Sequence, residues 1–328
     1  MPPPSSSSTR LITSFFSRAL SAFQNSGSKL QVICTTPPSL SGGGEPEALP
    51  PLVRPQTLVV LDSSFNPPTR AHLHMATSAI RELMQKQGQC LGAIRLLLLL
   101  SVNNADKGVK PAAFDKRLVM MWAFAQDVLH NLQMSFEDKQ ATSEAQGLCV
   151  DLGLATVPYF HEKSAVLAEA GFYKGQRDQD KNLAETEQVF LVGYDTLIRI
   201  FNPKYYGPLE GVNQVAAKEP TPLQKALDPF FASAKLRVTM RADDEWGGEE
   251  EQAAYLEDLL RAEGLHKIGG LTAWESRIEM VDGHKAGTQV ISSTYARNAV
   301  KNKDLEKLDL MVTPQVRWWI EQEGLYLE

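Results

Sequence analysis

The chain has 328 residues, 43% of them hydrophobic, and a formal net charge of −6. This length and composition allow a substantial core and one large domain or two average ones. The negative net charge argues against a broad surface for nucleic acid or anionic lipid, so any phosphate site is expected to be local. Three widely spaced cysteines without a Cys-x-x-Cys pair argue against a zinc or dithiol site and favour a reducing compartment.

The N-terminal segment allows two interpretations. Residues 1–44 contain no Asp or Glu, and apolar residues recur at helical spacing from Leu11 to Phe23, a composition similar to that of an organelle transit peptide. The alternative, which we favour, is a helix that packs on the domain, followed by a short strand at 30–34. We therefore expect residues 1–36 to be a packed extension or a targeting segment, in a cytoplasmic or nuclear protein or, if the segment is a signal, a mitochondrial one.

Further along, the chain alternates between strand and helix patterns. A Pro-, Gly- and Ser-rich loop is expected at 37–56, and a single domain at 57–328 with insertions near 207–234 and 243–286. The second insertion contains an acidic, amphipathic helix pattern. No apolar run approaches the roughly 20 residues that span a bilayer. The alternation predicts an α/β fold with strands buried as in a parallel sheet; the expected strands are 57–61, 94–100, 148–152, 188–192, 235–240 and 287–291, and the expected helices are 71–87, 111–132 and 161–171.

The first candidate phosphate site follows the strand at 57–61. Ser63 and Ser64 permit close backbone approach, and a helix that begins near Thr69 directs free N–H groups and its positive dipole end toward an anion. His72, on the same helical face as Thr69, can donate hydrogen bonds to a triphosphate. The alternative is that Thr69 is only an N-cap and His72 an internally bonded polar residue.

A second candidate site lies near the C-terminus. Ser292, Ser293 and Thr294 are expected at another helix N-terminus, and Arg297, one turn later, can bind phosphate oxygens through two N–H groups. By itself, this pattern would equally fit an ordinary Ser/Thr cap with an exposed arginine.

These two motifs resemble those of a known family. Ser-Phe-Asn-Pro-Pro-Thr-Arg-Ala-His at 64–72 is similar to the Gly-Ser-Phe-Asn-Pro-x-[His/Thr]-x-x-His signature of nicotinamide mononucleotide adenylyltransferases, with Ser63 in place of the opening Gly. Ile-Ser-Ser-Thr-x-x-Arg at 291–297 is similar to the family's second motif. The resemblance covers roughly 57–205 and 235–328 and implies a Rossmann-like, doubly wound parallel sheet of the nucleotidyltransferase superfamily with a C-terminal helical segment.

The resemblance also implies roles for other residues. Lys107, in a loop after the strand at 94–100, would bind phosphate, whereas Lys110, Lys116 and Arg117 are expected in a solvated basic loop. Gly193 and Asp195 would approach the nucleotide, although Asp195 could instead cap a helix at Thr196. The implied nucleotide-binding residues are Ser63, Ser64, Phe65, Thr69, Gly193, Asp195, Arg241, Ser292, Ser293 and Thr294; the implied catalytic residues are His72, Lys107 and Arg297.

The activity implied by the resemblance is transfer of the adenylyl group from ATP to nicotinamide or nicotinic acid mononucleotide, which yields NAD or its deamido form and pyrophosphate. Mg²⁺ is expected to arrive with ATP, because the sequence shows no dedicated carboxylate cage. The expected partners are ATP and a pyridine mononucleotide, with neither nucleic acid nor membrane, and a homo-oligomer is compatible with the sequence.

The sequence differs from the family's pattern in one element, the one that the resemblance assigns to the pyridine ring of the acceptor. The family's Val-Asp-x-Trp-Glu element is Val150-Asp151-Leu152-Gly153-Leu154 here, so the stacking Trp is missing. Tyr159 or Phe160 could offer an aromatic face instead, and Trp318 and Trp319 are expected in the core or on an amphipathic helix face. The alternatives are an ATP-hydrolysing or other nucleotidyltransferase of the superfamily, and a nucleotide-binding regulator without turnover.

Overall fold

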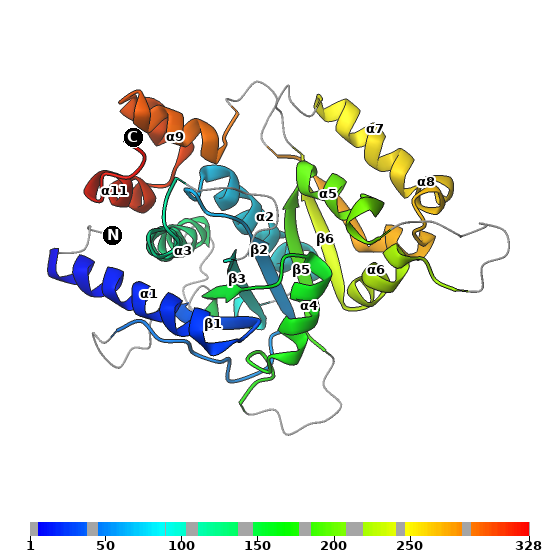
Figure 1. The fold of residues 1–328 in the computed structure, drawn as a ribbon, viewed down its shortest axis with the longest axis horizontal. Coiled ribbons are helices and arrows are strands. Elements are labelled where there is room, and N and C mark those ends of the chain that lie inside the picture. The colour runs from blue at the N-terminus through cyan, green and yellow to red at the C-terminus, as the bar shows by residue number, and fades with distance from the viewer. Residues whose placement is uncertain are drawn as a thin grey trace. The chain divides into compact units, whose positions relative to one another are not determined.

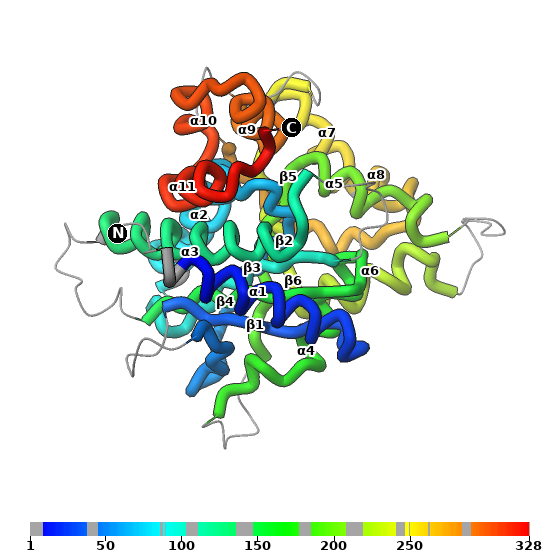
Figure 2. Tube along the Cα trace, turned by 60° about the vertical axis from the view of Figure 1, so that its left-hand side comes forward, coloured from blue at the N-terminus to red at the C-terminus, as the bar shows by residue number. Residues whose placement is uncertain are grey.

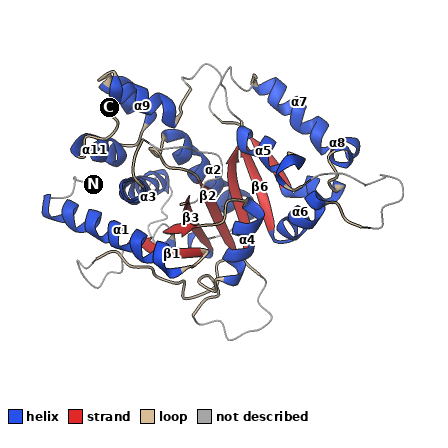
Figure 3. Ribbon diagram, in the orientation of Figure 1, coloured by secondary structure: helices blue, strands red, loops and turns tan. Residues whose placement is uncertain are grey.

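The computed structural model describes residues 6–37, 45–88, 90–102, 111–136, 147–176, 185–207, 219–240, 247–283 and 290–327. The chain forms two compact units (Figure 1). Unit 1 comprises residues 1–158, 166–186 and 291–328, and unit 2 comprises residues 159–165 and 187–290. Strands alternate with helices along both units, as Figure 3 shows, and most strand pairs are parallel. The expected α/β fold with a largely parallel sheet arrangement is therefore confirmed.

Unit 1 contains four strands in the order β1-β4-β3-β2. β2 (Thr57–Asp62), β3 (Ile94–Ser101) and β4 (Cys149–Ala155) are parallel, whereas β1 (Leu30–Thr36) pairs with β4 in the antiparallel sense at the edge of the sheet. Every residue of β3 is buried, as expected of a strand covered on both faces. The carboxyl ends of β2 and β3 lie side by side, because Asp62 pairs with Leu99 in the register.

In unit 1, α3 packs against α1, α2 and α11 and lies between α1 and α11 (Figure 2), whereas α9 packs against α10. Phe16 and Phe23 of α1 are buried, so the apolar stripe of the N-terminal helix contributes to the core of this unit. None of the described helices is long and apolar enough to cross a membrane. The helices are α1 (Ser6–Ser26), α2 (Arg70–Gln87), α3 (Phe114–Phe136), α9 (Ser293–Lys301), α10 (Leu305–Met311) and α11 (Pro314–Gln322), with α4 (Phe160–Glu169) shared between the units and a 3₁₀ turn at Leu91–Ala93.

Unit 2 contains three parallel strands in the order β5-β6-β7. Its aromatic core joins Phe190 of β5 to Phe230 and Phe231 of α6, and Trp274 packs on Phe231 at 5.3 Å between ring centroids. The elements are β5 (Glu187–Gly193), α5 (Tyr194–Ile200), α6 (Pro222–Ser233), β6 (Ala234–Thr239), α7 (Glu249–Leu260), α8 (Ala262–Lys267) and β7 (Ile278–Val281), with 3₁₀ turns at Pro203–Tyr205 and Thr272–Arg277.

The last strand of unit 2 differs from the sequence expectation. Most of the strand expected at 287–291 lies outside the described residues, and Val290 and Ile291 are not in a strand. The strand that pairs with β6 is β7, at 278–281. β7 has only four residues, none of them fully buried, so it lacks the apolar run that marks the other strands.

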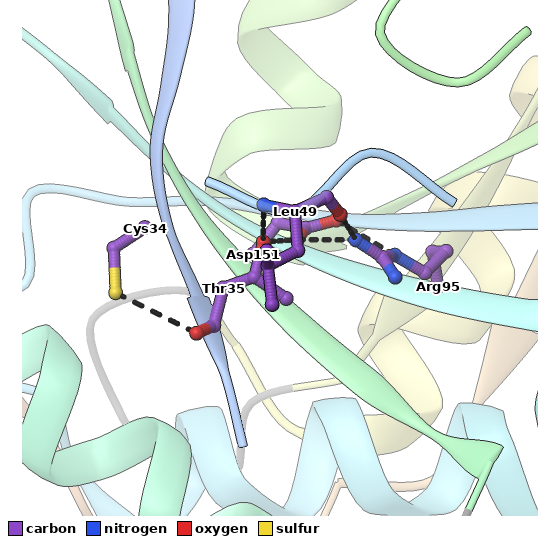
Figure 4. Close-up of polar contacts among 5 residues, drawn as sticks. All are labelled: Cys34, Thr35, Leu49, Arg95 and Asp151. Carbon is purple, nitrogen blue, oxygen red and sulfur yellow. Dashed lines mark hydrogen bonds and ion pairs between the residues drawn. The ribbon is translucent and has the colours of Figure 1, made fainter. Parts of the chain in front are cut away.

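A buried polar cluster crosses three strands of unit 1 (Figure 4). The guanidinium of Arg95 on β3 donates two hydrogen bonds to the carboxylate of Asp151 on β4, at 3.0 and 2.7 Å. Thr35 on β1 donates to the same carboxylate at 2.7 Å and accepts the N–H of Leu49, while Arg95 also donates to the Leu49 carbonyl. The cluster thus ties the N-terminal strand and the segment around Leu49 to the central strands.

Candidate functional site

The loop between β2 and α2, residues 63–68, is the centre of the candidate site. Its first residue, Ser63, donates its N–H to the carbonyl of Leu99 on the neighbouring strand. Phe65 has a φ of +43°, a conformation that few side-chain-bearing residues adopt. Its ring is fully buried and contacts Phe124 at 6.4 Å between centroids. Phe65 therefore anchors the loop in the core, and no part of this residue is exposed to meet a nucleotide.

His72 is fixed at the start of α2 by bonds to both ends of its ring. Thr69 is the N-cap of the helix, and its N–H donates to Nδ1 of His72 at 3.0 Å. Since a backbone N–H can only donate, Nδ1 must accept, and the proton of the neutral imidazole lies on Nε2. Nε2 is 3.0 Å from Oγ of Ser63. The imidazole thus presents an N–H donor toward Ser63, at the N-terminus of α2.

The second sequence motif lies against the same loop. Ser292 is the N-cap of α9, and its Oγ accepts the N–H of Tyr295 at 3.2 Å. Ser293 donates its hydroxyl proton to the Pro67 carbonyl at 2.8 Å. Because a serine hydroxyl has one proton, Ser293 is placed here to hold the loop and to accept, rather than donate, further hydrogen bonds. The two motifs, 226 residues apart, therefore form one structural unit.

Arg297 strengthens this connection. Its Nη1 donates to the carbonyl of Asn66 at 2.7 Å, and its Nη2 donates to Oγ1 of Thr294 at 3.1 Å. A guanidinium carries five N–H donors, so these two bonds leave three for an anion. The structure thus brings Ser63, Thr69, His72, Ser293 and Arg297 together within unit 1.

Lys116 and Arg117 do not lie in a solvated loop, contrary to the sequence expectation. Both belong to the first turns of α3, where Lys116 pairs with Glu323. Arg117 is buried and donates to the Ala112 carbonyl, and its Nη1 lies 3.4 Å from the carbonyl oxygen of Ser64. Burial lowers the pKa of Arg117 to about 10, with Arg297 adding to the effect. The helix expected at 111–132 already contained both residues, and this is the signal that could have placed them on a packed face.

Asn66 and Tyr326 are site residues that sequence reasoning missed. The Tyr326 hydroxyl donates to Oδ1 of Asn66 at 2.8 Å, and both residues are buried. Asn66 stood inside the first motif without a stated role, and nothing in the local sequence connects it to a tyrosine 260 residues away.

The candidate residues of unit 2 follow β5. Gly193 is the N-cap of α5, and Asp195 lies in the first turn of that helix. Asp195 therefore does not cap a helix at Thr196; its carboxylate lies near the positive end of the helix dipole. Lys107, Lys110 and Arg241 lie outside the described residues.

Aromatic side chains gather in unit 2 after the carboxyl end of β4. Tyr159 stacks on His161 with 5.6 Å between ring centroids, and His161 lies 5.7 Å from the ring of Tyr206. The Nδ1 atom of His161 is buried without a hydrogen-bond partner in the described part of the chain. Burial lowers the pKa of His161, opposed by the charge of Glu162, so the ring is held neutral. Tyr159, His161 and Tyr206 are called the aromatic cluster below.

The other aromatic candidates have structural positions. Phe160 packs on Phe190 at 5.7 Å between ring centroids. Trp319 is buried in α11, and Trp318 packs edge-on against it, as the sequence predicts. Among the described residues, no group of three or more His, Cys, Asp or Glu side chains is arranged to hold a metal ion.

Comparison with known proteins gives one sequence relative. No family model matches the chain. A protein of Schizosaccharomyces pombe named "Putative nicotinamide mononucleotide adenylyltransferase" is 33% identical over 263 residues, which cover 80% of this chain and 83% of the relative.

Several solved structures are also similar to the chain, among them the following two. Plasmodium falciparum nicotinic acid mononucleotide adenylyltransferase complexed with NaAD has a TM-score of 0.38 and 14% identity, over 83% of this chain and 97% of the other. Thermotoga maritima TmcAL bound with alpha-thio ATP has a TM-score of 0.35 and 14% identity, over 82% and 56% of the two chains. The extent and identity of the match to the fission yeast protein show that the chain belongs to the nicotinamide mononucleotide adenylyltransferase family.

Proposed function

We propose that this protein transfers the adenylyl group of ATP to nicotinamide or nicotinic acid mononucleotide, releasing pyrophosphate. The observation that carries the proposal is the attachment of two helix N-termini to one loop. α2 begins directly after residues 63–68, and α9 is tied to the same loop by Ser293 and Arg297. Helix N-termini attract anions, so this arrangement suits a triphosphate.

The chemistry requires alignment and charge neutralisation more than a nucleophilic side chain. An oxygen of the mononucleotide phosphate attacks the α-phosphorus of ATP, and the bond from that phosphorus to the oxygen bridging to the β-phosphate breaks. The electron pair of the broken bond leaves with pyrophosphate. Negative charge grows on the phosphoryl oxygens, where preorganised N–H donors stabilise it. His72 supplies Nε2–H, and Arg297 supplies its remaining N–H groups.

Lys107 is assigned to the leaving pyrophosphate, as the resemblance implies. The resemblance also assigns Thr69 to a phosphate oxygen, but its hydroxyl lies 2.8 Å from Nδ1 of His72 and donates its one proton there, so we assign Thr69 to holding that ring. Mg²⁺ would enter as the ATP complex and belong to the substrate. Gly193 and Asp195 are assigned to the adenosine half of ATP, with Arg241 as a further nucleotide contact.

The aromatic cluster is our candidate surface for the pyridine ring of the acceptor. Tyr159, His161 and Tyr206 are each only partly buried, and their rings supply faces on which a planar heterocycle can stack. This cluster would replace the tryptophan that the sequence lacks after Asp151. The amide and acid forms of the acceptor are compared in the test below.

The test is incubation of the purified chain with ATP, Mg²⁺ and each mononucleotide in turn, with nucleotides separated by chromatography. We expect a dinucleotide from at least one acceptor, with an equal amount of pyrophosphate. ADP and inorganic phosphate without dinucleotide would support the ATP-hydrolysing alternative and contradict the proposal. ATP binding with no product from either acceptor would instead support a regulator without turnover.

A further inference from the structure

We infer that Tyr326, two residues from the end of the chain, is a positioning residue for the ATP-binding loop and acts through Asn66. The inference rests on the proposed function, because the loop that Asn66 belongs to is the proposed phosphate site. Tyr326 would thus affect ATP binding without touching ATP.

The end of α11 is shaped to bring Tyr326 to this position. Gly324 has a φ of +57°, the Leu325 N–H donates to the Ile320 carbonyl at 3.0 Å, and the Gly324 N–H donates to the Glu321 carbonyl. This pair of bonds and the left-handed glycine are the Schellman arrangement that ends a helix and reverses the chain. After the turn, Tyr326 has a φ of +67°, which is costly for a residue with a side chain. The surrounding contacts must therefore offset that cost.

The contact at the end of this turn is the bond to Asn66. The Tyr326 hydroxyl donates to Oδ1 at 2.8 Å, in a buried environment where a hydrogen bond is stronger than in water. With Oδ1 accepting from the phenol, the orientation of the amide is set, and Nδ2 is the end able to donate elsewhere. The same residue gives its backbone carbonyl to Arg297. Asn66 is thus held by the chain end through its side chain and by α9 through its backbone.

The position of Asn66 explains why this bond would matter for ATP. It lies between Phe65, which has the unusual φ of +43°, and Pro67, whose carbonyl is bound by Ser293. Three residues on either side are Ser63 and Thr69, each within hydrogen-bond distance of a ring nitrogen of His72. A shift of Asn66 would therefore move the groups proposed to meet the phosphates, and small misplacements are expensive in a preorganised site.

The phenol is suited to act as a permanent donor. Burial raises the pKa of Tyr326, and the nearby guanidinium groups of Arg117 and Arg297 only partly oppose this effect. The hydroxyl therefore remains protonated at any pH used for an assay. The hydroxyl also lies 3.8 Å from Sδ of Met120, and sulfur is a weak acceptor.

The test compares Tyr326→Phe, Met120→Leu, Asn66→Ala and the double variant Tyr326→Phe/Asn66→Ala. ATP affinity is measured by calorimetry without acceptor, and KM and kcat are measured for each substrate. Tyr326→Phe keeps the buried ring and loses only the hydroxyl. We expect it to weaken ATP binding by about 3- to 10-fold, the usual range for one lost hydrogen bond, with the KM of the mononucleotide unchanged. Met120→Leu conserves volume and should bind ATP as the wild type does.

Coupling to Asn66 distinguishes positioning from simple packing. If Tyr326 acts through Asn66, adding Tyr326→Phe to Asn66→Ala should have no further effect on ATP affinity. Wild-type ATP affinity in Tyr326→Phe, or additive effects in the double variant, would overturn the inference while leaving the proposed function intact. A wild-type chain that binds no ATP would overturn both.

Discussion

Nε2 of His72 lies 3.0 Å from Oγ of Ser63, while Nδ1 of the same ring accepts the N–H of Thr69. The bond to Thr69 selects the tautomer, and the contact with Ser63 marks where the Nε2–H donor is directed. One imidazole thus caps a helix and presents a donor at the proposed phosphate site. These two tasks can be separated by mutation.

His72→Ala should remove both tasks. Loss of a single preorganised donor typically lowers kcat by about 100- to 1,000-fold. Loss of the bond to Thr69 should cost about 1 kcal/mol, which corresponds to a fall of about 1 to 2 °C in melting temperature for a chain of 328 residues. Turnover and thermal melting are measured on the same preparation.

His72→Glu is the matched control for the helix cap. A glutamate three residues after an N-cap threonine can accept the N-cap N–H, as in a capping box, and it has no N–H to donate. We expect wild-type melting together with a loss of turnover at least as large as that of the alanine variant. Wild-type turnover in either variant would contradict the role of His72.

The aromatic cluster leads to a prediction about the acceptor. Tyr159→Ala should raise the KM of the mononucleotide by about 2- to 12-fold, since a pair of stacked rings contributes about 0.5 to 1.5 kcal/mol. Tyr159→Phe retains the ring and should bind the acceptor almost as well as the wild type. The KM of ATP serves as the internal control. An increase in the KM of ATP alone would assign Tyr159 to the other substrate.

The buried ion pair of Arg95 and Asp151 should dominate the stability of unit 1. Asp151→Asn leaves the Arg95 guanidinium without a countercharge, and breaking a buried pair costs about 3–5 kcal/mol. The free energy of unfolding is measured by urea denaturation. The matched control is Arg18→Met, which breaks the exposed pair with Glu45 and should cost less than about 1 kcal/mol. An equally small loss of unfolding free energy in both variants would show that the buried pair does not stabilise unit 1.

Cys34 gives a prediction for alkaline pH. Burial, aided by the charge of Asp151, raises the pKa of this thiol from its ordinary value of 9.0 to about 12. Below pH 9 the folded and unfolded states are both protonated, and stability is unaffected. Above pH 9 the unfolded chain loses a proton that the folded chain keeps, so stability falls as the pH rises toward the folded pKa. The slope is about 1.4 kcal/mol per pH unit.

Cys34→Ala should remove this part of the slope between pH 9 and 10.5, measured by urea denaturation at each pH. Cys90→Ala, which changes an exposed thiol, serves as the control and should retain the wild-type slope. A Cys34→Ala slope equal to that of the wild type would contradict the raised pKa.

Much of the fold was predictable because its signals are local. The apolar run at 94–100 became β3, and Gly88 ends α2 with a φ of +64°, as expected of a glycine after a helical pattern. β7 was missed because a strand of four residues, none of them buried, is too short to give a clear apolar pattern. In the polar cluster, Asp151 was noted only as the residue before a missing tryptophan. Its partners Arg95 and Thr35 lie on other strands, so the pairing depends on sheet order, which the sequence does not display.

The candidate site was predictable where the proposed phosphate-binding residues lie close together in a short motif. Ser63, Thr69 and His72 lie within ten residues, and their contacts follow from one strand, one turn and one helix. The link from Arg297 to Asn66 and the link from Tyr326 to Asn66 were not predictable, because each joins residues more than 200 positions apart. Arg117 was misplaced since a basic side chain near a loop is usually solvated, whereas here α3 buries it.

The fate of each phosphate of ATP tests the proposed reaction most directly. The chain is incubated with Mg²⁺, a pyridine mononucleotide and ATP labelled at either the α- or the γ-phosphate. We predict that α-label appears in the dinucleotide and γ-label in pyrophosphate, at equal rates, and that both transfers are lost in His72→Ala. Release of γ-label as inorganic phosphate, with α-label remaining in ADP, would contradict adenylyl transfer.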